Sequence, residues 1–351
     1  MDFIDIFQAK LLTETNPKTT KKIPQKTPFW FMRQAGRYLP EYRALREKSG
    51  GFLPMCYTPE IATEITMQPI TRFGMSAAII FSDILVIPHG LGLKLEFMAG
   101  EGPNLQTITH ANELPRLSIE AMREHLRPVY AALTQTRAAL APDKALIGFA
   151  GAPWTLLCYM LDGNGRGDFM QARTAIYSNP EMCHTIIALL VEAISEHLCA
   201  QIEAGANAVQ IFDSWAAHVP SHLREALIFA PTKAIVESVR LRHPNAPIIC
   251  FPRGVGEADY VRFAEIVQPD GISVDQFTDM ASLSVKIPEH ITLQGNVDNL
   301  ALAYNAKEAV RQVSALKAAM QGKRFVLNLG HGVIPQTPVE NMQAIIDAVR
   351  G

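Results

Sequence analysis

The sequence has almost no excess charge of either sign. Its 32 Lys and Arg residues are balanced by 34 Asp and Glu residues, and the formal net charge at pH 7 is -2. Proteins that bind nucleic acid or anionic lipid over a broad surface usually carry a clear excess of Lys and Arg. This balance excludes a broad basic surface, so an anionic ligand must be met by a local cluster of basic side chains.

Cysteine is scarce, and its spacing shows no motif. A disulfide framework normally uses an even set of closely spaced cysteines in a short secreted chain. This chain instead has five cysteines without a CxxC pair, namely Cys56, Cys158, Cys183, Cys199 and Cys250. We therefore expect reduced and mostly buried thiols inside the cell.

Long apolar segments are also missing. Residues 1–26 contain neither the apolar core of a signal peptide nor the Arg-rich, acid-poor composition of a transit peptide. No apolar run reaches the roughly 18 residues of a membrane span without a charge or a helix breaker interrupting it. We expect a cytoplasmic protein with no membrane partner.

The sequence does contain many short apolar runs. Hydrophobic residues make up 48% of the chain and charged residues 19%, a composition that can bury a large core. Runs bounded by Gly, Pro, Asn or Asp predict eight buried strands. They lie at residues 28–32, 78–86, 145–150, 208–212, 247–251, 271–274, 291–294 and 324–328.

Segments of helical character separate these strands. They lie at residues 59–73, 118–140, 168–204, 222–241, 260–267, 303–320 and 338–349. Alternating helices and continuously apolar strands favour a parallel sheet covered on both faces. We predict a single α/β domain, a (β/α)8 TIM barrel over residues 27–351, preceded by an N-terminal arm at 1–26. An open doubly wound sheet is the alternative, but its Gly-rich fingerprint is absent after the first strand.

Polar residues follow the predicted strands, where a TIM barrel carries its active site. They are Arg33, Arg37, Asp83, Trp154, Tyr159, Asp213, Ser214, Arg253, Asp275, Asn296, Asp298 and His331. From residue 33 to residue 46 the chain carries four arginines against only Glu41. Guanidinium groups bind carboxylates through paired, charge-assisted hydrogen bonds. This loop therefore predicts a site for a ligand with several carboxylates, and the alternative is a solvated basic turn.

Asp83 and His331 are the two candidates for chemistry outside the arginine loop. Asp83 lies in an apolar run, where a carboxylate is costly to bury unless donors or a cation meet it. It either pairs internally with an Arg or accepts N–H groups of a ligand. His331, between two glycines, either contacts a ligand or is merely hydrogen-bonded. The Gly-rich stretch at 163–167 lacks the Lys and Ser or Thr of a phosphate loop and predicts a turn or lid hinge.

Taken together, these residues resemble the uroporphyrinogen decarboxylase family over essentially the whole chain. The run Pro-Phe-Trp-Phe-Met-Arg-Gln-Ala-Gly-Arg at 28–37 is similar to that family's N-terminal signature, and Gly-Phe-Ala-Gly-Ala-Pro-Trp-Thr-Leu at 148–156 is similar to a second one. Four further blocks match in order and spacing, at residues 81–85, 210–214, 293–296 and 328–332. The sequence at 251–254, Phe-Pro-Arg-Gly, departs from the Lys-Gly pair of the family.

The resemblance implies a homodimeric barrel that needs no cofactor or metal and converts uroporphyrinogen III to coproporphyrinogen III. By residue-to-residue transfer it implies that Arg33, Arg37 and Arg46 bind substrate carboxylates. It implies that Asp83 binds the pyrrole N–H groups and that Phe212 lines the macrocycle pocket. Further substrate contacts transferred in this way are Tyr159, Ser214 and His331.

The implied reaction needs an electron sink and an anion. Loss of CO2 from an acetate leaves an electron pair at the ring methylene, and a pyrrole protonated at a ring carbon can accept that pair. Asp83 is suited to stabilise the resulting cation in a pocket of low dielectric constant. The proton donor is Arg33 assisted by Asp83, or else His331 or a bound water, which are chemically easier because a guanidinium holds its proton tightly.

Two other functions fit parts of the pattern. A barrel methyltransferase of the same superfamily would need a zinc site, typically a His-x-Cys pair with a later Cys. His197 and Cys199 have this spacing, but they lie in a segment predicted to be helical. Cys183 next to His184 is a second candidate in the same segment, and helix residues one or two positions apart point in different directions. A porphyrin-binding protein without activity is the second rival, and a turnover assay separates it from the enzyme.

Overall fold

One parallel sheet of seven strands forms the centre of the protein. The computed structural model describes residues 3–8, 26–98 and 102–351. The strands are β1 (Ala77–Ile79), β4 (Ala145–Gly151), β5 (Ala208–Asp213), β6 (Ile248–Pro252), β7 (Gly271–Ser273), β8 (Thr292–Val297) and β9 (Phe325–Leu329). Their order across the sheet is the order along the chain, so each connection leads to the neighbouring strand.

The segment predicted as a first strand, residues 28–32, joins the two edges of this sheet. On one side the Trp30 N–H donates to the Leu327 carbonyl of β9 at 3.3 Å. On the other side the Ser76 N–H, next to β1, donates to the Phe29 carbonyl at 2.9 Å. Only Phe29 forms a bridge here instead of a full strand. The strands thus curl into a barrel, and the TIM-barrel prediction is confirmed.

The strand prediction at 78–86 is wrong beyond Ile79. The chain leaves the sheet because the Phe81 N–H turns to the hydroxyl of Thr66, at 2.9 Å. The Asp83 carboxylate then accepts the Leu85 N–H at 2.9 Å, a side-chain turn that competes with strand pairing. The apolar residues after it belong to a short buried helix, so periodicity alone could not separate them from a strand. Asp83 therefore lies in the loop after β1.

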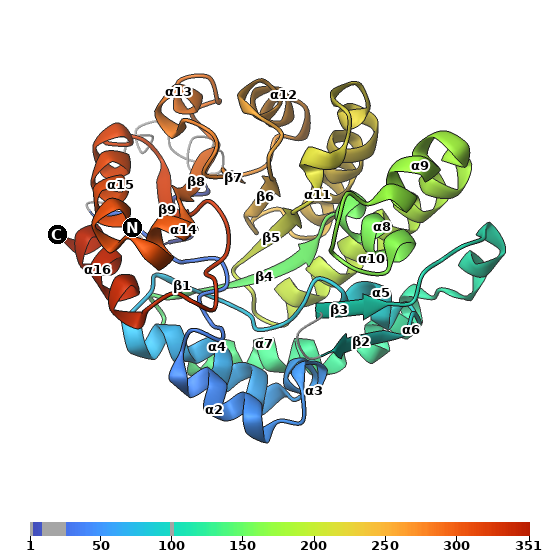
Figure 1. The fold of residues 1–351 in the computed structure, drawn as a ribbon, viewed down its shortest axis with the longest axis horizontal. Coiled ribbons are helices and arrows are strands. Elements are labelled where there is room, and N and C mark those ends of the chain that lie inside the picture. The colour runs from blue at the N-terminus through green and yellow to red at the C-terminus, as the bar shows by residue number, and fades with distance from the viewer. Residues whose placement is uncertain (1–2, 9–25, 99–101) are drawn as a thin grey trace.

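Helices cover the outside of the barrel (Figure 1). They are α2 (Pro40–Lys48), α3 (Phe52–Tyr57), α4 (Pro59–Phe73), α5 (Val86–Gly90), α6 (Ile119–His125), α7 (Arg127–Ala139), α8 (Pro153–Asp162), α9 (Met170–Ser178), α10 (Pro180–Glu203), α11 (Ala230–Arg242), α12 (Glu257–Val267), α13 (Met280–Ser284), α14 (Asn299–Tyr304), α15 (Ala306–Ala319) and α16 (Val339–Arg350). Two predicted long helices are each divided by an asparagine. The side chain of Asn179 caps α10, and that of Asn305 caps α15.

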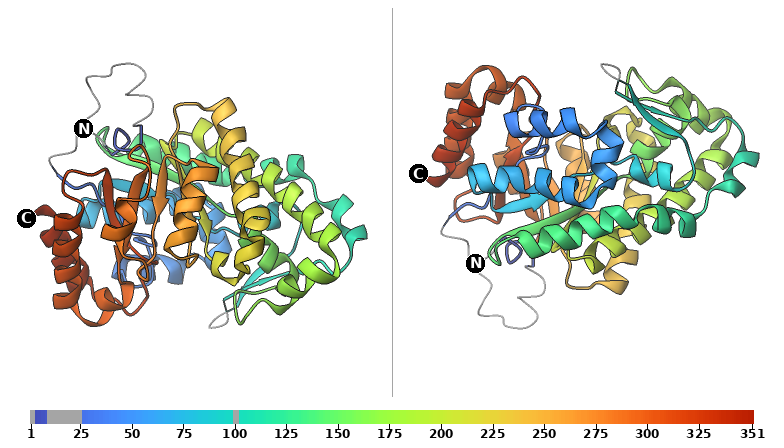
Figure 2. Two further views of the ribbon diagram at one scale, coloured as in Figure 1. Left: turned by 90° about the horizontal axis from the view of Figure 1, so that it is seen from above. Right: turned by 90° about the horizontal axis from the view of Figure 1, so that it is seen from below.

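A small antiparallel hairpin was not predicted. It consists of β2 (Leu95–Met98) and β3 (Gly102–Leu105) and lies on the opposite side of the molecule from α15 and α16 (Figure 2). The end of β3 contacts the end of α8, where the Leu105 N–H donates to the Gly163 carbonyl at 2.7 Å. Gly163 ends α8 in the left-handed conformation, so the predicted turn at 163–167 begins as a helix cap.

The barrel interior is closed at its amino-terminal end by residues 3–8. Phe3, Ile6 and Phe7 are buried there, and the Ile6 carbonyl accepts the Thr292 hydroxyl at 2.6 Å. Gly271 makes room for Phe7, since a Cβ at Gly271 would lie 2.6 Å from the Phe7 ring. The remainder of the predicted arm lies mostly outside the described residues, and its boundary stays a prediction.

A layer of hydrogen-bonded polar side chains fills the middle of the barrel. Trp30 donates its indole N–H to the Gln294 amide oxygen at 2.8 Å. The Gln294 amide nitrogen donates to Gln210 at 3.1 Å and to the Ser273 hydroxyl at 2.7 Å. Every one of these side chains is buried, and buried polar groups are tolerated when they are paired in this way. The layer fixes the register of the strands beneath the active-site end.

Helix α10 is long and apolar enough to span a membrane by length and composition. The helix contains the charged residues Glu192 and Glu196, and 61% of its most apolar window is buried inside the protein. It packs against α8, α11 and β4. These are the features of a core helix. The five cysteines are also buried and unbridged, as expected from the sequence.

Candidate active site

Aromatic rings from neighbouring strands form an apolar floor at the carboxyl-terminal end of the barrel. The Phe149 and Phe212 rings lie 5.7 Å apart in an edge-on arrangement, and those of Phe212 and Phe251 lie 6.4 Å apart. Met32 and Ile79 pack against the same cluster. Phe212, predicted to line a macrocycle pocket, is thus the central ring of this floor.

Arg33 follows the closing segment in an unusual backbone conformation. Its φ is 60°, in the left-handed region that non-glycine residues rarely adopt. Gln34 fixes this turn, because its side-chain oxygen accepts the Phe31 N–H at 3.1 Å and its nitrogen donates to the Ala77 carbonyl at 3.0 Å. A strained turn held by a fully buried amide fixes the direction in which the Arg33 side chain leaves the backbone.

The last strand brings His331 and Gly332 against Arg33. A Cβ at Gly332 would lie 2.4 Å from Cδ of Arg33, so the guanidinium arm passes directly over this glycine. The Val333 N–H donates to the Met32 carbonyl at 2.9 Å, and Asn299 donates to the Gly332 carbonyl at 2.9 Å. The motif at 328–332 and the motif at 28–37 therefore build one wall.

Asp83 reaches this wall from the loop after β1. Its side chain keeps some contact with solvent although protein surrounds it, as expected of a group deep in a recess. Desolvation raises the pKa of Asp83 to about 6, and the Leu85 N–H and the nearby Arg33 only partly oppose this shift. Burial thus outweighs the attraction of the cation. Among the described residues, the Leu85 N–H is the single hydrogen-bond donor to this carboxylate, which leaves it free acceptor capacity.

Arg37 and Arg46 gather around Tyr42, beside the loop that carries Asp83. Burial raises the pKa of Tyr42, and the charges of Arg46 and Arg37 partly oppose that rise. The Tyr42 ring packs edge-on against Phe81 at 5.8 Å, two residues before Asp83. Arg37 is exposed and Arg46 half-buried. Among the described residues, neither has a carboxylate within ion-pair distance.

Tyr159 and Ser214 follow the next two strands of the sheet, since Tyr159 lies in α8 after β4 and Ser214 comes directly after β5. Desolvation, followed by the charge of Asp83, raises the pKa of Tyr159 to about 12. A Cβ at Gly165 would lie 2.4 Å from the Tyr159 hydroxyl, so the segment after α8 passes over this group. Ser214 is half-buried directly after β5. The preceding residue, Asp213, is buried with a pKa raised to about 7 by desolvation, and it accepts the Thr155 hydroxyl at 2.6 Å.

The neutral form of His331 is favoured by its surroundings. Desolvation, followed by the positive charges of Arg253 and Arg33, lowers the pKa of His331 to about 3. Its Nδ1 atom is buried without a hydrogen-bond partner. His331 therefore faces this recess as a neutral imidazole that can donate or accept a hydrogen bond.

The predicted site residues thus meet at one end of the barrel. The charge of Arg33 acts on the pKa of Asp83, of Tyr159 and of His331, so these three groups lie near it, while Arg37 and Arg46 lie near Tyr42. Arg253 follows a predicted strand, and the sequence alone gives it no role. Its charge acts on the same recess, and its place opposite the arginine loop in the barrel order was the available signal.

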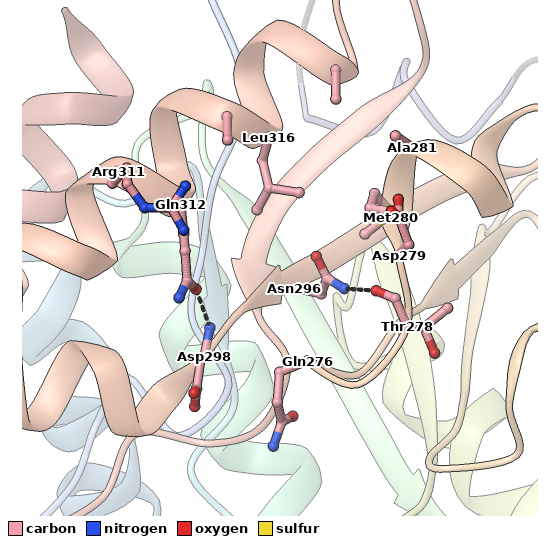
Figure 3. A pocket seen from close by; sticks show the side chains of 12 residues that line it. Gln276, Thr278, Asp279, Met280, Ala281, Asn296, Asp298, Arg311, Gln312 and Leu316 are labelled. Atoms are coloured by element: carbon pink, nitrogen blue, oxygen red, sulfur yellow. Dashed lines mark hydrogen bonds between the residues drawn. The ribbon is translucent and has the colours of Figure 1, made fainter.

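A separate pocket of about 420 Å³ lies between the end of β8 and α15 (Figure 3). Several of its polar groups already have partners. Arg311 pairs with Glu308, Gln312 accepts the Asp298 N–H at 2.9 Å, and Asn296 donates to the Thr278 carbonyl at 2.8 Å. Asn296 and Asp298, two of the polar residues at strand ends, line it, but no residue with a predicted role does. Within the described part of the chain, no group of three or more His, Cys, Asp or Glu side chains could hold a metal ion.

Comparison with known proteins gives the family. The uroporphyrinogen decarboxylase (URO-D) family matches residues 18–351. The chain belongs to the uroporphyrinogen decarboxylase family. It is 43% identical over 325 residues to the uroporphyrinogen decarboxylase of Acidiphilium cryptum, covering 92% of this chain and 90% of that protein. It is 42% identical over 340 residues to the one of Erythrobacter litoralis, covering 97% and 98%. The family resemblance read from the sequence is confirmed.

Solved structures support the fold. A methyltransferase from Methanosarcina mazei aligns with a TM-score of 0.74 at 18% identity, over 98% of each chain. A putative vitamin-B12 independent methionine synthase from Listeria monocytogenes aligns with a TM-score of 0.55 at 13% identity, over 93% of this chain and 96% of that one. At these identities the likeness concerns the barrel alone.

Proposed function

We propose that this chain is a uroporphyrinogen decarboxylase, which removes the four acetate carboxylates of uroporphyrinogen III to give coproporphyrinogen III and CO2 in haem biosynthesis. The observation that carries this proposal is the pairing of Asp83, a carboxylate that protein largely surrounds, with nearby arginines that lack ion-pair partners in the described structure. An anion at the centre suits pyrrole N–H groups, and cations around it suit carboxylates. The identity of more than 40% to named decarboxylases supports the same activity.

The substrate contacts follow from this arrangement. Arg33, Arg37 and Arg46 bind carboxylates of the substrate, and Phe212 packs against the macrocycle. Asp83 accepts hydrogen bonds from the pyrrole N–H groups. Tyr159, Ser214 and the neutral His331 complete the hydrogen-bonding rim.

The reaction proceeds through the pyrrole itself. Protonation of a ring carbon gives a cationic pyrrole, the bond between the acetate methylene and its carboxylate breaks, and CO2 leaves while the electron pair enters the ring system. A proton added to the methylene then gives the methyl group, and loss of the proton first added to the ring carbon restores the neutral pyrrole. Asp83 stabilises the cationic stage, because a fixed charge acts strongly in a site with little water.

Arg33, assisted by Asp83, delivers the ring proton in this proposal. His331 is a weaker candidate, since a pKa of about 3 leaves almost no imidazolium at neutral pH. Arg33 instead lies beside Asp83, in a turn that fixes its direction. A water held between these two groups is the natural carrier of the proton.

Two rival functions receive less support. A zinc-dependent methyltransferase needs a group of metal donors, and the described residues do not bring three such side chains together. A binding protein without activity would share the floor and the arginines. Turnover separates it from the enzyme.

The proposal is tested by anaerobic incubation of the purified protein with uroporphyrinogen III, followed by oxidation and chromatography of the porphyrins. The expected products carry seven, six, five and finally four carboxylates. Recovery of the octacarboxylate alone would contradict the proposal. The homodimer and the cytoplasmic location implied by the family are further proposals, and light scattering of the purified protein tests the first.

A further inference from the structure

Arg253 is a positively charged residue of the site that has no role so far. It follows β6, and its side chain is half-buried. Its Nε atom is buried without a hydrogen-bond partner, and Nη1 reaches only the Ser214 carbonyl, at 3.5 Å. No carboxylate of the described residues forms an ion pair with it. A guanidinium has five N–H donors, so most of its capacity is unused.

The nearest acid does not neutralise Arg253 by contact. Asp275 is fully buried, and one of its oxygens accepts the Tyr260 hydroxyl at 2.8 Å and the Gly254 N–H at 2.7 Å. The other oxygen accepts the Phe277 N–H at 2.9 Å. Desolvation lowers the pKa of Arg253, and the charge of Asp275 acts against that shift from nearby. Arg253 is thus a partly desolvated cation without an ion pair, because Asp275 accepts its hydrogen bonds from Tyr260 and from backbone N–H groups.

Arg253 lies across the barrel from the arginine loop. Counting the closing segment at 28–32 as one position, the sheet order places β6 four positions away in either direction. The charges of Arg253 and Arg33 nevertheless both act on His331. The two guanidiniums therefore both lie near His331 although they come from opposite sides of the barrel. A turn at Gly254, with φ of 77° and too little room for a Cβ beside Ala217, fixes the exit of the chain.

We propose that Arg253 binds a carboxylate of the substrate at the edge of the ring opposite Arg33 and Arg37. This inference rests on the proposed function. A ring with carboxylates around its whole perimeter needs cations on opposite sides of the barrel end that binds it. A ligand with a single acidic end would be held by one side alone. Arg253 thus selects for substrates that carry acid groups on both edges.

Direct binding tests this inference without turnover. The wild-type protein, Arg253→Gln and Arg253→Lys are titrated with uroporphyrin, the oxidised ring with eight carboxylates, and with coproporphyrin, which keeps only the four propionates. Arg311→Gln is the matched control, because it removes an arginine from the outer face of α15. Thermal unfolding of each variant shows that it is folded.

We expect Arg253→Gln to raise the dissociation constant for uroporphyrin about tenfold or more, the loss typical of a charged hydrogen bond. Arg253→Lys should recover part of this loss, and Arg311→Gln should leave binding unchanged. A parallel loss for coproporphyrin assigns the bound group as a propionate, and a loss for uroporphyrin alone assigns it as an acetate. Unchanged binding in folded Arg253→Gln, or an equal loss in Arg311→Gln, would overturn the inference.

Turnover of uroporphyrinogen III by the wild type is scored separately, so its absence would count against the proposed function and not against this contact.

Discussion

The side chain of Arg33 crosses the α-carbon of Gly332 so closely that a Cβ there would lie 2.4 Å from Cδ of the arginine. The contact joins the first and last segments of the barrel, which are about 300 residues apart in the sequence. It places Arg33 beside both Asp83 and His331. The direction of Arg33 therefore depends on the absence of a side chain at residue 332.

Gly332→Ala tests this dependence. The added methyl group must displace the flexible arm of Arg33 and leave the backbone in place. We expect kcat/KM for uroporphyrinogen III to fall at least about tenfold, with little change in Tm, since one misplaced charged contact is worth about 1.5 kcal/mol. Steady-state kinetics and thermal unfolding measure both effects. Full activity in the folded variant would show that the position of Arg33 is unimportant.

Arg37→Ala should weaken substrate binding without disturbing the fold. Arg37 is exposed and forms no ion pair with any described residue, so its removal leaves no buried partner unsatisfied. We expect KM to rise about tenfold, from the loss of about 1.5 kcal/mol for a charged hydrogen bond. An unfolded variant, or a folded one with an unchanged KM, would instead indicate that Arg37 belongs to a structural turn.

The kcat/KM of the enzyme should depend on pH through the ionisation of Asp83. Because desolvation raises the pKa of Asp83 to about 6, kcat/KM should fall as the pH drops through about 6. The raised pKa also means that ionised Asp83 destabilises the folded protein above pH 6, and that this effect disappears below its ordinary pKa. Asp83→Asn should accordingly gain stability over the wild type at pH 8 and show little difference at pH 4. Thermal unfolding at both values checks the sign, and an unstable variant at pH 8 would contradict it.

Activity should survive exhaustive chelation and need no added nucleotide, flavin or pyridoxal phosphate. The reason is chemical, since a protonated pyrrole accepts the electron pair that decarboxylation leaves. Turnover is measured before and after dialysis against a chelator. A strict metal requirement would defeat the proposed mechanism.

The sequence predicted the barrel better than it predicted the loops. Strands β4, β5 and β6 agree with their predictions to within one residue at each end, because continuous apolar runs in a parallel sheet are bounded by clear turn residues. The same signal failed at residues 80–86, where buried apolar residues continue into a loop and a short helix. The β2 and β3 hairpin carries no clear alternation and contains Pro103 and Gly102, so nothing marked it as paired.

The sequence predicted candidate residues that lie in motifs. It did not predict residues whose importance depends on which side chains form ion pairs in the fold. Arg33, Asp83 and His331 stand at strand ends, and the fold places Arg33 near both of the others, while their roles stay a prediction. The sequence shows a basic residue at position 253. It does not show that Arg253 lacks an ion pair, because the oxygens of Asp275 accept hydrogen bonds from Tyr260 and the backbone instead. Such a competition between partners is fixed by three-dimensional contacts that no local pattern encodes.

The most direct test of the account is the turnover of Asp83→Asn, measured together with its affinity for uroporphyrin. Asparagine is nearly isosteric and keeps a hydrogen-bond acceptor, but it brings no negative charge to the cationic pyrrole. We expect affinity within a few-fold of the wild type and a fall in kcat of at least about a hundredfold, roughly 3 kcal/mol, as is typical of losing an electrostatic stabiliser in a dry site. Full decarboxylation of uroporphyrinogen III by folded Asp83→Asn would contradict the central role given to this carboxylate.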